Sequence, residues 1–181
     1  MSSRILIAGI GSDFQGDAGF GVEVARRLGR GPAPAGITVS EVGVRSLHLA
    51  YAMLERPDLL LVLDAVRRSE APGTVYLIDV SALAGAAPRE IPATFGLSID
   101  TVVTACWTLG GKAPPMLLIG CEPDFVGDRT GLSAAVTAAL PRAEQLVRAT
   151  VGRWMGRPAG QPIGGITKSS QDGVWFPSVD G

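Results

Sequence analysis

At its amino end the chain reads Arg4-Ile5-Leu6-Ile7-Ala8-Gly9-Ile10-Gly11-Ser12-Asp13-Phe14-Gln15-Gly16-Asp17-Ala18-Gly19-Phe20-Gly21-Val22-Glu23-Val24-Ala25. A short apolar run passes into a glycine-rich loop that carries acidic residues, and a helical pattern of apolar residues follows. This order predicts a strand over residues 4–8 and a helix from residue 18 to residue 29. In open α/β folds, a loop of this kind lies at the carboxyl ends of the strands, where functional sites are found.

Apolar runs of strand length alternate with helical patterns along the rest of the chain, which is typical of stacked βα units. We expect strands at residues 37–42, 59–64, 74–78 and 116–120, and helices at residues 46–54, at 98–109 and from Ser133 onward. The segment 59–64 is continuously apolar and is predicted to be central, whereas 37–42 is predicted to lie nearer the sheet edge. Ser98 is expected to cap its helix, and Pro141 to kink or restart the last one.

One antiparallel strand is predicted from the spacing of the strands. Too few residues separate segment 59–64 from segment 74–78 for a crossover helix, so we expect these two segments to form a hairpin-like pair. The predicted fold class is therefore α/β, a three-layer sandwich in which helices flank a mainly parallel twisted sheet with one antiparallel strand.

Length and composition limit the classes of function. The chain has 181 residues, and we expect one domain over residues 1–155 and an extended or disordered tail over residues 156–181. A net charge of −1 without a basic cluster argues against nucleic-acid binding. The first apolar run is too short for a membrane span and carries no cleavage pattern, so we expect no membrane insertion and a cytoplasmic protein. Two cysteines are too few for a disulfide framework and lack C-x-x-C spacing for zinc.

The opening loop does not match the common nucleotide-binding motifs. Phe14 occupies the third glycine position of a dinucleotide fingerprint, and no Gly-Lys-Ser or Gly-Lys-Thr follows for a Walker A motif. A local alternative is that the glycines make a tight strand-to-helix turn and Asp17 caps the helix or complements its dipole.

Asp64 is a second candidate, because a carboxylate at the end of an apolar central strand is costly unless it is paired, hydrogen-bonded or bound to a metal. It is expected at the same sheet edge as the opening loop. If Asp17 and Asp64 face one crevice, they would support a hard-metal or nickel site, or acid–base chemistry. The alternative is that Asp64 accepts backbone N–H groups from the turn after its strand.

Three spaced motifs resemble those of the hydrogenase maturation endopeptidases. The first is Gly9-Ile10-Gly11-Ser12 followed, after three residues, by Gly16-Asp17-Ala18-Gly19-Phe20-Gly21-Val22. The second joins Leu61-Val62-Leu63-Asp64-Ala65-Val66 to Ala71-Pro72-Gly73-Thr74, and the third is Gly131-Leu132-Ser133. The resemblance covers residues 4–155.

This resemblance implies a phosphorylase/hydrolase-like α/β fold and a role in NiFe-hydrogenase assembly. The implied reaction removes a short carboxyl-terminal extension from the large subunit after nickel has been installed. The implied partner is the NiFe-hydrogenase large-subunit precursor, and the nickel is expected to come with that substrate rather than to be tightly bound by the free protein. The implied substrate-binding loop contains Gly9, Gly11, Ser12, Gly16 and Gly19.

The ligand positions of the family are only partly kept. Its usual metal contacts, a Glu or Asp, an Asp and a His, fall on Ala18, Asp64 and Ala93, and Ser12 replaces its usual Asn. Only Asp64 retains a ligating side chain. The other side chains that we consider as replacements are Asp17, Asp13, His48, and Cys121 with Glu122 and Asp124.

Two functional hypotheses follow. In the first, the protein is a working processing peptidase in which Asp64, with Asp17 as a further candidate, contacts nickel already held by the substrate. In the second, it is a catalytically inactive homologue that acts as a hydrogenase assembly or binding factor. A third hypothesis is a Rossmann-like nucleotide-binding enzyme.

Overall fold

The computed structural model describes residues 3–44, 46–81, 96–157 and 174–175. Its strands are β1 (Ile5–Ile10), β2 (Ile37–Gly43), β3 (Leu59–Ala65), β4 (Val75–Asp79), β5 (Met116–Cys121) and β6 (Val174–Trp175). Its helices are η1 (Asp17–Gly19), α1 (Phe20–Leu28), α2 (Ser46–Leu54), α4 (Gly96–Thr108) and α5 (Ala134–Gly156). All of them belong to one sheet and the helices around it.

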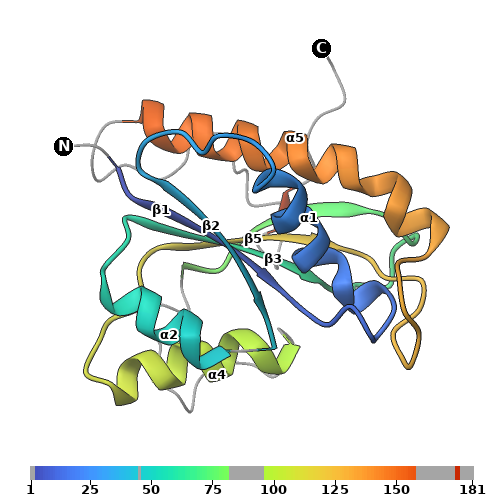
Figure 1. The fold of residues 1–181 in the computed structure, drawn as a ribbon, viewed down its shortest axis with the longest axis horizontal. Coiled ribbons are helices and arrows are strands. Elements are labelled where there is room, and N and C mark those ends of the chain that lie inside the picture. Colours follow the sequence, from blue (N-terminus) through green and yellow to red (C-terminus); the bar gives the residue numbers. More distant parts are fainter. Residues whose placement is uncertain (1–2, 45, 82–95, 158–173, 176–181) are drawn as a thin grey trace.

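The fold is a three-layer α/β sandwich, as predicted (Figure 1). Helices α1 and α5 cover one face of the sheet, and α2 and α4 cover the other (Figure 1). Alternation along β1 explains both interfaces, because Ile5 and Ile7 pack toward α1 and α5 while Leu6 and Ala8 pack toward α2 and α4. Two apolar clusters, one on each face, therefore make up the core.

The strand order is β2-β1-β3-β5-β4-β6. Strand β3 is central and β2 lies at an edge, which confirms both predictions. Among the described strands, only β4 runs opposite to the others, because it is antiparallel to both β5 and β6. One antiparallel strand was therefore correctly expected.

The partner predicted for this strand was wrong. β4 does not form a hairpin with β3, because β5 lies between them and pairs with both. All six residues of β5 are buried, so its backbone N–H and C=O groups are satisfied by hydrogen bonds to a neighbouring strand on each side. The linker after β3 crosses the carboxyl end of β5, where the Val66 N–H donates to the Cys121 carbonyl over 2.9 Å.

Several boundaries differ from the predictions. β1 continues to Ile10, and the first helix begins with the 3-10 turn η1 rather than with an α-helical turn. Ser98 lies inside α4, which already begins at Gly96, so Ser98 is not its N-cap. Pro141 does not restart the last helix: it lies exposed within a helix that continues to Gly156.

Two residues of the predicted tail pair with the sheet. Within the stretch 156–181, Val174–Trp175 forms the extended strand β6 beside β4. No helix in the described ranges has both the length and the apolar character needed to cross a bilayer.

Candidate functional site

Glycines bring helix α1 into direct contact with the sheet. A Cβ atom at Gly9 would collide with the Gly21 carbonyl oxygen, and one at Gly21 would collide with the Leu63 carbonyl oxygen. Close backbone packing between α1, β1 and β3 therefore requires glycine at both positions.

Two further glycines shape the loop between β1 and α1. Gly11 has φ +126° and a Cβ there would collide with the Ala18 carbonyl oxygen, so the loop folds back on itself at this point. Gly16 has φ +60°, and its Cβ would lie 2.9 Å from the Phe125 carbonyl oxygen. We call Gly9, Gly11, Gly16 and Gly21 the glycine frame. A Cβ atom at each of them would meet the chain's own backbone, so close packing accounts for all four glycines.

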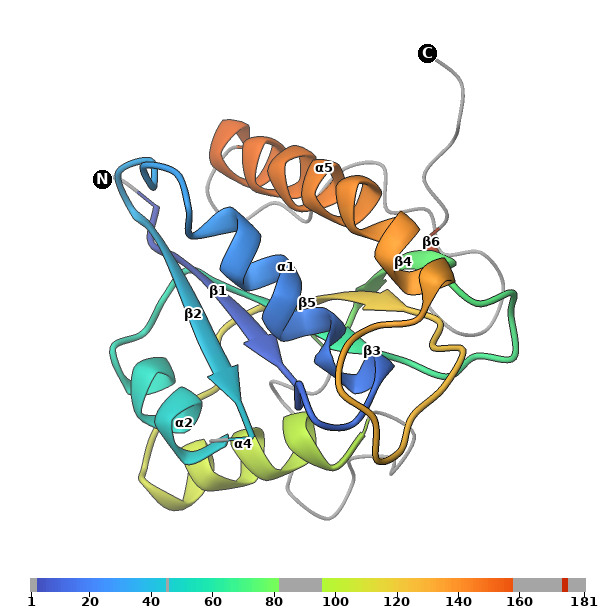
Figure 2. The same ribbon diagram turned by 45° about the vertical axis from the view of Figure 1, so that its right-hand side comes forward.

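The loop after β1 is hydrogen-bonded to the loop before α5, and we call residues 11–17 and 122–133 the paired loops (Figure 2). The Gly16 N–H donates to the Arg129 carbonyl over 2.6 Å, and the Asp17 N–H donates to the Phe125 carbonyl over 2.9 Å. The Arg129 N–H donates in turn to the Phe14 carbonyl over 3.2 Å. The paired loops therefore form one hydrogen-bonded structure at the carboxyl ends of the strands.

Asp17 joins the paired loops through its side chain. Asp17 is 1% exposed, and its Oδ2 accepts the N–H groups of Asp124 and Phe125, each over 2.9 Å. Its Oδ1 accepts the Ser133 N–H over 2.6 Å. Burial raises the pKa of Asp17, but the hydrogen bonds from Phe125, Ser133 and Asp124 outweigh burial and hold the pKa below its usual value.

Asp17 does not cap the helix with its side chain, because neither η1 nor α1 has a side-chain cap. It does lie in the first turn of η1, where a negative charge complements the helix dipole, as the other half of that alternative expected. The acceptor instead serves the distant loop and Ser133, which is the N-cap of α5. These three bonds account for a buried carboxylate at this position.

Asp64 lies where the sequence places it, at the carboxyl end of β3. Pairing of Gly9 with Leu63 puts Asp64 level with the end of β1, and η1 contacts β3. Asp64 is half-buried and its Oδ1 accepts the N–H of the next residue, Ala65, over 2.8 Å. Ala65 is the last residue of β3, so this bond lies within the strand and not in the turn after it. A carboxylate therefore lies at the carboxyl end of β3, beside the opening loop.

The structure does not bring Asp17 and Asp64 together on one face. Leu60 and Val62 pack toward α2 and α4, and by strand alternation Asp64 continues that face. Asp17 instead binds Ser133, at the start of α5 on the opposite face. The two carboxylates therefore lie toward opposite faces of the sheet, at the carboxyl ends of its strands.

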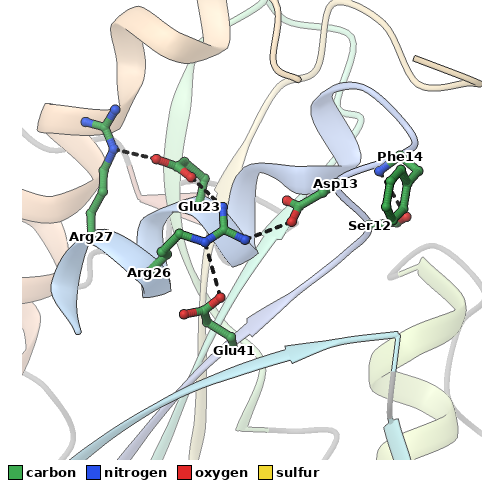
Figure 3. Close-up of polar contacts among 7 residues, drawn as sticks. All are labelled: Ser12, Asp13, Phe14, Glu23, Arg26, Arg27 and Glu41. Atoms are coloured by element: carbon green, nitrogen blue, oxygen red, sulfur yellow. Dashed lines mark hydrogen bonds and ion pairs between the residues drawn. The ribbon is translucent and has the colours of Figure 1, made fainter. Parts of the chain in front are cut away.

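Asp13 is held by an ion-pair network around Arg26 (Figure 3). The Arg26 guanidinium lies 2.8 Å from Asp13, 2.7 Å from Glu23 and 3.3 Å from Glu41. Hydrogen bonds to Asp13 and Glu23 raise the pKa of Arg26. Burial raises the pKa of Glu23, but Arg27 and Arg26 more than offset it, so this pKa lies below its usual value. The network ties the opening loop to α1 and β2.

The remaining candidates do not assemble a replacement ligand set. The Ser12 Oγ accepts the Phe14 N–H over 3.3 Å within the loop, and His48 is exposed on α2. Ala18 is half-buried and has no ligating group, while Ala93 lies outside the described residues. Among residues that the structure describes, no three His, Cys, Asp or Glu side chains converge as metal ligands. The described donors therefore do not fit a resident metal site.

At the end of β5, Cys121 and Glu122 are buried but Asp124 is exposed, so these three residues do not face one site. Burial, together with the negative charges of Asp17 and Glu122, raises the pKa of the Cys121 thiol to about 12. The Glu122 carboxylate accepts a hydrogen bond from the Tyr76 hydroxyl over 2.7 Å. Sequence reasoning missed this pair, which lies 46 positions apart and carries no spacing pattern.

Comparison with known proteins identifies relatives over most of the chain. The family model HycI, described as hydrogenase maturation protease, matches residues 22–150. The hydrogenase expression/formation protein HupD of Rhodobacter capsulatus is 31% identical over 155 residues, which cover 81% of this chain and 72% of HupD. HupM of Azotobacter chroococcum is 33% identical over 163 residues, which cover 82% of this chain and 76% of HupM.

A solved structure shows the same fold. The hydrogenase maturating endopeptidase HybD of Escherichia coli aligns with a TM-score of 0.67 and 26% identity. The alignment covers 82% of this chain and 92% of HybD. The stretch matched by the family model begins just after Gly21 and includes Asp64 and the start of α5.

Proposed function

The chain belongs to the hydrogenase maturation protease family, and on this premise we propose that it processes the large subunit of a NiFe hydrogenase. The reaction is hydrolysis of one peptide bond, which releases a carboxyl-terminal extension after nickel insertion. The observation that supports it best is the half-buried Asp64 carboxylate, held at the carboxyl end of β3 beside the glycine-rich loop. This is the family ligand position at which the chain keeps a ligating group.

In this proposal nickel is part of the substrate. Asp64 contributes a carboxylate oxygen to the nickel that the precursor already holds, and the contact places the scissile bond at the sheet edge. We place the reaction in the cytoplasm, since both cysteines are free thiols, as is usual in a reducing compartment.

The second candidate function is favoured by Ala18, which has no ligating atom where the family carries a carboxylate. In that case the protein binds the precursor and assists assembly without cleaving it. The Rossmann-like hypothesis is not kept, because the family match assigns the chain elsewhere.

The test is to incubate the protein with a nickel-loaded large-subunit precursor and follow the precursor's mass. We expect loss of the extension with the wild-type protein and at least a hundredfold slower loss with Asp64→Asn, which preserves size and shape. Glu55→Gln is the matched control, because Glu55 is exposed and lies between α2 and β3, before the amino end of that strand. Unchanged mass in a stable complex would establish the assembly factor instead, and full activity of Asp64→Asn would remove Asp64 from the mechanism.

A further inference from the structure

The segment that follows Asp64 is fastened to β5 at two points. The Val66 N–H donates to the Cys121 carbonyl over 2.9 Å. Two residues later, the Arg68 N–H donates to the Glu122 Oε2 over 2.7 Å. The chain leaving β3 is thus held across the end of the neighbouring strand, and this attachment limits where Asp64 can move.

Glu122 is the centre of this attachment. It is 4% exposed, and its Oε2 also accepts the hydroxyl of Tyr76, which is fully buried, over 2.7 Å. Its backbone is fixed as well, because its N–H donates to the Thr74 carbonyl and its carbonyl accepts the Gly73 N–H, each over 2.8 Å. Burial and the Glu122 carboxylate raise the pKa of Tyr76, so this phenol is a hydrogen-bond donor at neutral pH.

The sheet register places this cluster beside Asp64. Asp64 pairs with Gly120 in β5, and Gly120 pairs with Tyr76 in β4, so these residues form one row across three strands. Side chains in one row share a face of the sheet. A Cβ atom at Gly120 would lie 3.0 Å from the Val66 Cγ2 and 3.2 Å from its Cβ, so glycine leaves room for Val66 between Asp64 and Tyr76.

Packing alone does not require a carboxylate at residue 122. Burying an ionised group costs several kcal/mol unless hydrogen bonds offset the loss of water, and an apolar side chain of similar volume would avoid that cost. The carboxylate oxygen does what an apolar side chain cannot: it accepts a donor from the segment after β3 and a donor from β4 at once. Its position suggests a role in holding that segment.

We propose that Glu122 and Tyr76 are positioning residues, which hold the 65–68 segment and thereby orient the Asp64 carboxylate toward the substrate. This inference rests on the proposed function, in which Asp64 contacts the nickel-bearing precursor. Neither side chain touches the substrate. They act on the rate of cleavage through the backbone that carries Asp64.

The choice of variants follows from the shared oxygen. Both hydrogen bonds end on Oε2, so the amide oxygen of Glu122→Gln accepts both, whereas Glu122→Met accepts neither. Tyr76→Phe removes one donor with almost no change in volume. Tyr51→Phe, which removes a hydroxyl from an exposed tyrosine of α2, is the matched control.

Cleavage kinetics are measured at a temperature where every variant is folded. We expect kcat to fall at least tenfold in Glu122→Met and Tyr76→Phe, KM to stay within about twofold, and Glu122→Gln to remain within about threefold of wild type. A lower Tm with unchanged kcat would show that the cluster serves stability alone and would overturn the proposal. If Glu122→Met does not fold, Tyr76→Phe decides the question.

A second measurement separates this inference from the proposed function. Amide hydrogen exchange and the ¹³C signal of the Asp64 carboxyl are recorded on the free protein. We expect exchange at Arg68 to become at least tenfold faster in Tyr76→Phe, with a shifted Asp64 signal and unchanged exchange in β1. If the wild-type protein leaves the precursor intact, the proposed function fails, and these spectra still test the positioning role. An unchanged Asp64 signal would reject it.

Discussion

Replacing Asp17 by asparagine tests whether its carboxylate holds the paired loops together. In Asp17→Asn one oxygen becomes an NH₂ group, which cannot accept a hydrogen bond. We expect the amide oxygen to stay on the N–H of Ser133, which is buried, and the NH₂ to turn toward the N–H groups of Asp124 and Phe125, because these two residues are exposed and their hydrogen bonds are only part-buried. The retained bond also loses its charge assistance.

The expected loss follows from these bonds. A hydrogen bond to a charged group contributes about 1.5–3 kcal/mol, and two of the three are removed while one is weakened. Partial solvation of the two released N–H groups reduces the total, so we expect the free energy of unfolding to fall by about 2–4 kcal/mol. Asp128→Asn, at an exposed aspartate of the same loop, is the control and is expected to change it by less than about 0.5 kcal/mol.

The pH dependence gives an independent check. The pKa of Asp17 is lower in the folded protein than its usual value, so its contribution is fully present above the unfolded pKa of about 4 and is lost as the pH falls through the folded pKa. We measure the free energy of unfolding by urea titration with tryptophan fluorescence. The difference in this free energy between wild type and Asp17→Asn should be constant from about pH 5 to 8 and should shrink below about pH 4. A difference under about 0.5 kcal/mol at pH 7, or one that shrinks as the pH rises, would refute this account of Asp17.

Three further changes test the packing, the thiols and the ion pairs. Gly21→Ala should lower the free energy of unfolding by about 3 kcal/mol or more, because the added Cβ meets a carbonyl of β3. Gly31→Ala is the control, because a Cβ there has no atom within 4 Å. Equal stability of the two variants would contradict the glycine argument. Burial raises the pKa of the Cys106 thiol, and it raises that of Cys121 to about 12. Neither thiol should therefore react with a disulfide reagent at about pH 8 until the protein is unfolded. Fast labelling of the native protein would show that the thiols are accessible. Arg26→Met should cost about 1 kcal/mol at low salt and less at about 1 M salt, since the guanidinium is partly exposed; a cost independent of salt would assign the effect to packing.

Much of the fold could be predicted because its signals are local. The continuous apolar run of β3 marks a strand that is buried on both faces, and the alternating pattern of β2 marks an edge strand. The position of Asp64 at a strand end follows from the same pattern. The partner of β4 could not be obtained in this way, because linker length excludes a crossover helix but does not exclude a path around the end of β5.

The sequence by itself determined the layer architecture, the glycine frame, the carboxylate at residue 64 and the absence of a ligating group at Ala18. Each of these depends on the identity of one residue or on the period of a short segment, which folding does not alter. Only the tertiary structure decided what Asp17 and Glu122 do. Asp17 accepts N–H groups from residues 107 to 116 positions away, and Glu122 joins segments from three strands. A buried carboxylate is stabilised by whichever donors surround it in the folded chain, and local sequence does not specify those donors.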